Sequence, residues 1–87
     1  MIYGQHNQTI GKDTEEQLVY KHLASLAYDP MKRRFGFGLD ECVMCLRYSG
    51  IKTDISIVKQ SLRLMVLTGF LEEFYSRERD NVIYRLP

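Results

Sequence analysis

The 87-residue sequence contains no tryptophan, two prolines and two cysteines. Two cysteines are too few for a disulfide scaffold, so we expect free thiols in a reducing, intracellular compartment, either the cytoplasm or the nucleoid or nucleus. No run approaches the roughly 20 apolar residues of a bilayer span, and residues 1–8 lack the layout of a secretory signal, so we expect no membrane partner. Repeats are also missing, and this length suffices for one domain but not for two.

Motifs for catalysis and metal binding are equally scarce. Cys42 and Cys45 have the C-x-x-C spacing, but a closed zinc site needs four ligands, and His6 and His22 form no second pair. The redox form of this motif needs a helix start after a strand. We therefore interpret Cys42 as a small core residue and Cys45 as partly exposed. No residues stand in a recognisable nucleophile or acid–base setting, so we expect no enzyme, no cofactor and no metal.

Apolar residues and unevenly distributed charge are what the chain does have. The hydrophobic fraction of 45%, with six tyrosines and four phenylalanines, suffices for a small core and excludes general disorder. Residues 30–63 carry seven basic and three acidic side chains, whereas the segments on either side are net acidic. A local basic excess is expected of a protein that binds a polyanion, although patches of this size also occur on ordinary solvated faces.

The first third of the sequence predicts an arm and a helix. Residues 1–12 have no period and form a flexible N-terminal arm, with Ile2, Tyr3 and Ile10 as docking contacts, ahead of a single domain over residues 13–87. Asp13 or Thr14 caps a helix that Asp29 and Pro30 end. Its apolar residues recur at spacings of four and three and share one face: Val19, Leu23, Leu26 and Ala27.

The basic middle of the chain predicts a short extended piece and a second helix. Residues 31–38 mix charge, aromatics and glycine, which predicts an extended segment that buries Phe35 and Phe37. Asp40 then caps a short helix, with Leu39 as a hydrophobic staple, that ends at Gly50. Its expected inward residues are Cys42, Val43 and Leu46.

A third helix is predicted from Thr53 or Asp54 to about residue 68, with Gly69 beyond its end. One stripe of this helix is apolar and turns inward: Ile55, Val58, Leu62 and Met65. Another stripe, at the i, i+3, i+4 and i+7 positions, is polar and basic with no acidic member: Ser56, Lys59, Gln60 and Arg63.

The C-terminal residues predict a β-hairpin. Residues 70–75 and 81–86 read as two strands around a charged turn over residues 76–80. We expect the hairpin to cover the open side of the helices with four apolar side chains: Leu71, Phe74, Val82 and Tyr84.

This order of elements resembles winged-helix domains over about residues 13–87. Residues 56–71 carry the most specific likeness, because they look like a recognition helix that runs through a leucine, glycine, aromatic, leucine step into the first wing strand. The resemblance implies an α+β winged helix, with a three-helix core and a C-terminal two-stranded hairpin as the wing. Short chains of this kind are similar to archaeal, bacteriophage and bacterial transcriptional regulators. The basic insertion over residues 29–38 and the acidic wing match no single group.

A DNA-binding function follows from the resemblance, with the third helix in the major groove of double-stranded DNA. Such a chain is a small transcriptional regulator and a homodimer, because one helix of this size reads few base pairs. Ser56, Lys59, Gln60 and Arg63 would face bases, while Lys52 and Thr53 would contact phosphate. Further contacts would come from Arg77 and Arg79 in the wing and from Lys32, Arg33 and Arg34 as a phosphate clamp, unless this run is only a solvated loop.

Two other functions fit the same residues. The wing also carries Glu72, Glu73, Glu78 and Asp80, which repel phosphate unless they point outward or pair with arginines. The chain would then be an adaptor that binds a protein of the transcription or replication machinery, such as a polymerase subunit. Its candidate contact residues are Tyr48, Leu64, Leu67 and Tyr75. In a third alternative the chain mainly forms a homodimer through its first helix and arm.

Overall fold

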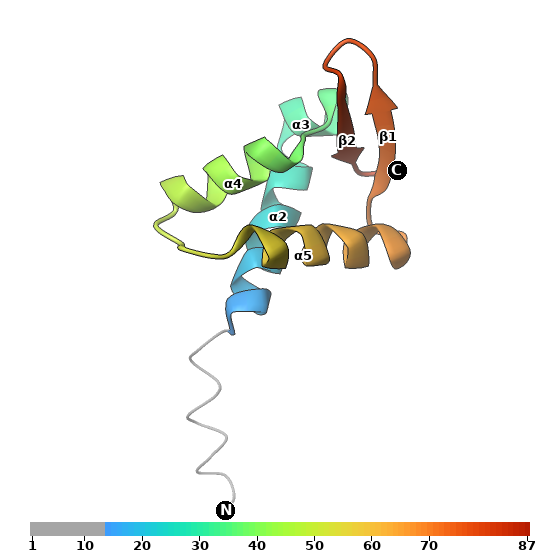
Figure 1. Ribbon diagram of the computed structural model, residues 1–87. Helices are drawn as coiled ribbons and strands as arrows, with labels where there is room; N and C mark the ends of the chain where they lie inside the picture. The colour runs from blue at the N-terminus through green and yellow to red at the C-terminus, as the bar shows by residue number, and fades with distance from the viewer. Residues whose placement is uncertain (1–13) are drawn as a thin grey trace, which may run out of the picture.

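The computed structural model describes residues 14–87, and it has an α+β fold. In this part of the chain, four helices precede a two-stranded antiparallel hairpin (Figure 1). They are α2 (Glu15–Tyr28), α3 (Pro30–Phe35), α4 (Leu39–Tyr48), α5 (Ile55–Leu67), β1 (Glu72–Ser76) and β2 (Asn81–Arg85). The predicted arm over residues 1–12, its docking contacts, and Asp13 as a cap lie outside the described residues. Over residues 14–87, no helix has the length and apolar character to cross a bilayer.

Helix α2 begins and ends where its capping residues predict. The Thr14 hydroxyl accepts a hydrogen bond from the Gln17 backbone N–H at 3.1 Å, and the Gln17 side chain accepts one from the Thr14 N–H at 2.9 Å. This reciprocal capping box satisfies two donors that have no partner inside the helix. The helix ends before Asp29, and its inner face buries Val19 and Leu23 completely.

The segment over residues 31–38 corrects our prediction of an extended piece, because most of it is helix α3. The Asp29 carboxylate accepts a hydrogen bond from the Met31 N–H at 3.0 Å, and Pro30 occupies the first helical position, where its missing N–H costs nothing. Phe35 is 55% exposed, so its predicted burial is wrong. Phe37 lies beyond the helix, is fully buried, and pairs with Tyr84 in an isolated antiparallel bridge.

Helix α4 has a different cap from the one predicted. Its N-cap is Gly38, whose N–H donates to the Glu41 carboxylate at 3.0 Å, while Asp40 lies inside the first turn. Cys42 and Leu46 are buried and Val43 is half-buried. Burial, with smaller contributions from nearby acidic groups, raises the pKa of the Cys42 thiol to about 12. Cys42 is therefore an unreactive core thiol, while Cys45 is half-buried, and neither forms a disulfide.

Helix α5 packs against α2 and α4 through one apolar face. Asp54 caps it by accepting from the Ser56 N–H at 3.4 Å, and Gly69 follows its end with a positive φ of 83°, as predicted. Three of the four predicted inward residues are buried: Val58, Leu62 and Met65. Ile55 is 49% exposed, because the first turn of α5 extends past the core. The prediction for this residue is therefore wrong.

The hairpin leaves the end of α5 and turns back past α3 (Figure 1). Phe74 pairs with Ile83 and Tyr75 with Val82, so Phe74 and Val82 point to opposite faces of the hairpin. The prediction that Val82 enters the core is wrong: Val82 is 39% exposed, and Ile83 is buried in its place. Leu71 is buried as predicted.

The burial of Leu62 makes the stability of the domain sensitive to this side chain. We expect Leu62→Ala to lower the free energy of unfolding by about 2 to 5 kcal/mol, because a cavity replaces a fully buried side chain. Leu64→Ala on the same helix is the control, and we expect a change within about 0.5 kcal/mol since Leu64 is 51% exposed. Urea unfolding measures both. Equal losses in the two variants would contradict the orientation of α5.

Candidate nucleic-acid interface

The outward face of α5 presents the four residues that the sequence predicts as base contacts. Ser56, Lys59, Gln60 and Arg63 are all exposed, because they lie on the side of the helix opposite Val58, Leu62 and Met65. Helix α5 contains no aspartate or glutamate. This face therefore offers two cations and several hydrogen-bonding groups with no carboxylate from its own helix.

A groove of about 400 Å³ runs between this face and the hairpin. Lys59, Gln60 and Arg63 line one side of it, and Glu73 and Tyr84 line the other. Glu73 and Tyr84 are cross-strand partners, so they share one face of the hairpin. The sequence analysis does not place them in the interface, although correct strand pairing would have predicted their proximity to each other. The groove is consequently of mixed charge, with Glu73 opposite the basic residues.

Tyr84 lies in this groove as a neutral phenol. Its partial burial raises its pKa, the charge of Glu73 raises it further, and the charge of Arg63 lowers it in part. Its ring also packs 6.2 Å, centroid to centroid, from the ring of Phe37. Tyr84 therefore packs against the core through its ring and also lines the groove, where it supplies a hydroxyl group.

The two predicted phosphate contacts before α5 differ in their surroundings. Lys52 is exposed, and within residues 14–87 it forms no ion pair. Thr53 is half-buried, and its hydroxyl donates a hydrogen bond to the Glu15 carboxylate at the start of α2. Only Lys52 of this pair is fully available to a ligand.

Two of the other predicted DNA contacts, Lys32 and Arg79, form ion pairs with Glu41. Its carboxylate forms an ion pair with Lys32 of α3, and the Arg79 guanidinium of the hairpin turn lies 2.6 Å from it. Arg79 also donates to the Phe35 carbonyl at 3.5 Å. Lys32 and Arg79 thus tie α3, α4 and the hairpin together, and a phosphate would have to compete with Glu41 for them.

The remaining predicted contacts lie on α3 and in the hairpin turn. Arg33, Arg34 and Arg77 are exposed, and the Arg34 guanidinium lies 5.2 Å from the centroid of the Phe35 ring. Figure 1 shows α3 and the hairpin turn at one end of the molecule, whereas α5 crosses α2 part-way along its length. The predicted basic residues therefore form two separate groups, one on α5 and one on α3 and the hairpin turn.

The side chains that commonly bind metal ions are dispersed over the described part of the chain. Within residues 14–87, no three His, Cys, Asp or Glu side chains cluster in a way that could hold a metal ion. The His22 ring nitrogen lies 2.9 Å from the Leu18 carbonyl one turn earlier in α2, which is a local helix contact.

Comparison with protein-family models, with characterised proteins and with solved structures gives no match for this chain.

The Glu41 cluster predicts a pH dependence of stability. Partial burial acts to raise the pKa of Glu41, but hydrogen bonds from Lys32 and the Gly38 N–H and the charges of Lys32 and Arg79 outweigh it, so the pKa is below its ordinary value of 4.5. A carboxyl with a lowered folded-state pKa stabilises the fold above its unfolded-state pKa, and this stabilisation is lost as the pH falls through the folded-state value.

We therefore expect Glu41→Gln to destabilise the protein at pH 7, and the difference from the unaltered protein to shrink as the pH falls below 4.5. Thermal unfolding followed by circular dichroism across this range measures the effect. Glu78→Gln is the matched control, since Glu78 is exposed in the hairpin turn. A pH-independent difference for Glu41→Gln would show that the cluster contributes no linked protonation.

Proposed function

We propose that the chain is a small winged-helix protein that binds double-stranded DNA through α5 and regulates transcription. The observation that carries this proposal is the outward face of α5, where Ser56, Lys59, Gln60 and Arg63 are exposed on a helix without acidic residues. Arginine and lysine donate to guanine edges and glutamine pairs with adenine, so these are residue types that read a major groove.

The arrangement around α5 supports the winged-helix assignment. Helix α4, the connection over residues 49–54 and α5 follow one another in the manner of a helix-turn-helix, and the hairpin follows α5 directly. The Phe37 bridge to β2 adds a short third extended piece beside the hairpin, on the side away from β1. In this proposal α5 enters the major groove and the hairpin serves as the wing.

The charges indicate unequal roles for the basic groups. Lys59, Arg63 and Lys52 form no ion pairs within residues 14–87, so their charges are available to the duplex. Lys32 and Arg79 are already paired with Glu41, which leaves Arg33, Arg34 and Arg77 as additional phosphate contacts. Each phosphate that the protein neutralises adds about −0.9 to the slope of log affinity against log salt.

Dimerisation belongs to this proposal because α5 is 13 residues long and a single such helix contacts few base pairs. Two copies on a pseudo-palindromic site would double the recognised sequence. The homodimer that forms mainly through the first helix and arm remains the third alternative.

An adaptor function is the second candidate, and one observation favours it. Leu64 and Leu67 are 51% and 72% exposed and neighbour each other on α5, beside the residues that would face DNA. Exposed leucines on a recognition helix fit a protein surface better than a phosphate backbone. Tyr48 and Tyr75 are also exposed, at 85% and 58%. A chain of this kind would select no duplex sequence.

Substitutions on α5 test the DNA-binding function. We expect Lys59→Ala and Arg63→Ala each to weaken specific duplex binding by about 1 to 3 kcal/mol, because each removes a base contact. Lys21→Ala on α2 is the control, since it removes one positive charge from a helix outside the interface. Duplexes first selected from a random-sequence pool supply the site, and electrophoretic shifts at two salt concentrations measure affinity and its salt dependence.

The selection separates the two candidate functions. Enrichment of a sequence motif, with binding that weakens as salt rises, supports DNA readout. Unchanged affinity in both α5 variants would remove the recognition role of this face. Failure of any motif to enrich at low salt would favour the adaptor.

A further inference from the structure

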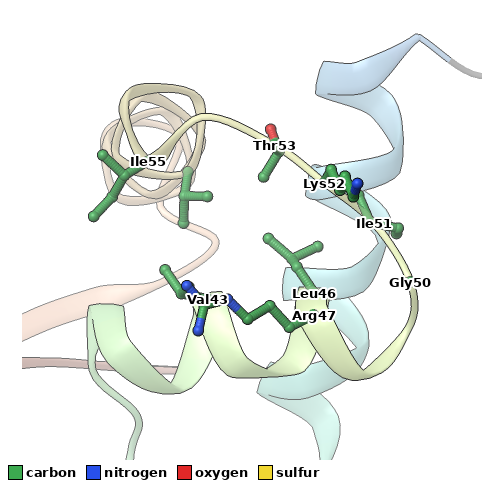
Figure 2. Close-up of a pocket in the computed structure, with 9 residues that line it drawn as sticks. Val43, Leu46, Arg47, Gly50, Ile51, Lys52, Thr53 and Ile55 are labelled. Atoms are coloured by element: carbon green, nitrogen blue, oxygen red, sulfur yellow. The ribbon is translucent and has the colours of Figure 1, made fainter.

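A second cavity lies between α4 and the first turn of α5, on a different side of α5 from the groove. It has a volume of about 490 Å³, which is within the range of small-molecule sites. Figure 2 shows that α4, α5 and the connection over residues 50–53 frame this space, with Leu46 and Ile55 among the side chains around it. The hairpin contributes no residue to this cavity.

The wall of this cavity is mainly apolar. Val43, Leu46, Ile51, Ile55 and Val58 supply five aliphatic side chains, and Leu46 and Val58 are only 1% exposed. Ile55 is 49% exposed, although it lies on the same stripe as buried residues of α5. An apolar occupant would cover this side chain and remove its hydrocarbon surface from water.

The charge at the cavity has one sign. Arg47 and Lys52 both line it and are exposed, and no aspartate or glutamate is among its lining residues. Within residues 14–87 neither cation forms an ion pair. Two carboxylates adjoin the cavity lining and both have partners: Glu15 accepts from the Thr53 hydroxyl, and Asp54, between the lining residues Thr53 and Ile55, accepts from the Ser56 N–H. The cavity thus combines an aliphatic wall with two unpaired cations.

We infer that this cavity binds a small carboxylate with an aliphatic body. The hydrocarbon part would lie against Leu46, Ile55 and Val58, and the carboxylate would meet the Arg47 guanidinium, which extends along α4 toward Val43 (Figure 2). Lys52, on the other side of the cavity, adds a second positive charge that favours an anion. A cationic amphiphile would meet like charges, and a neutral one would gain only the apolar contacts. The cavity shares Lys52 and Thr53 with the predicted phosphate contacts, but it contains none of the predicted base contacts, and octanoate binding can be measured without DNA.

Octanoate is the probe, and nuclear magnetic resonance of the ¹⁵N-labelled chain without DNA is the measurement. We expect saturable shifts of backbone amides around Val43, Arg47 and Ile55, with octylammonium and octanol binding about tenfold or more weakly than octanoate. This comparison uses the unaltered protein, so it holds even where a variant fails to fold.

A charge-removal pair sharpens the test. We expect Arg47→Gln/Lys52→Gln to weaken octanoate binding by about tenfold or more, whereas Arg33→Gln/Arg34→Gln, which removes two exposed charges from α3, leaves it unchanged. Shifts spread over the whole surface, equal binding of the three probes, or equal affinities of the two double variants would overturn the inference. Loss of DNA binding alone would not, since no step of this experiment uses DNA.

Discussion

The burial of one face of α5 is the constraint on which the rest of the structure depends. Val58, Leu62 and Met65 are almost completely removed from water against α2 and α4. A helix has one angular position that achieves this burial, so the same packing turns Ser56, Lys59, Gln60 and Arg63 outward. The candidate interface is therefore a consequence of the core, and a rotation of α5 would lose both together.

The hairpin is fixed to this core from two directions. Phe37 pairs with Tyr84 through hydrogen bonds of 2.9 and 2.8 Å, and the Glu41 carboxylate connects Arg79 of the hairpin turn to α3 and α4. Gly36 lies so close to β2 that a Cβ atom there would come within 2.3 Å of Ile83, and its φ of 80° also favours glycine. These contacts hold the hairpin beside α3 and place Glu73 and Tyr84 along one side of the groove that Lys59, Gln60 and Arg63 line.

Sequence patterns within a few residues predict much of this fold. Features that depend on contacts between distant residues were not predicted. The caps at Thr14 and Asp54 and the glycines after α4 and α5 mark boundaries through contacts within a few residues, so the sequence reveals them. The sequence does not predict helix α3, because Asp29 and Pro30 were interpreted as the end of the preceding helix, whereas they also cap and begin the next one. The hairpin pairing fixed which of Val82 and Ile83 is buried, and strand propensity alone does not contain that pairing. Glu41 pairs with Lys32 and Arg79, which lie 9 and 38 residues away in the sequence. No local sequence pattern predicts these two ion pairs.

We propose above all that the outward face of α5 is the surface that binds DNA. A titration of the ¹⁵N-labelled chain with a duplex that it selects, followed by nuclear magnetic resonance, tests this claim most directly. We expect the largest amide shifts at Ser56, Lys59, Gln60 and Arg63, with smaller ones at Lys52 and the hairpin turn. Shifts concentrated on α2, with α5 unaffected, would contradict it.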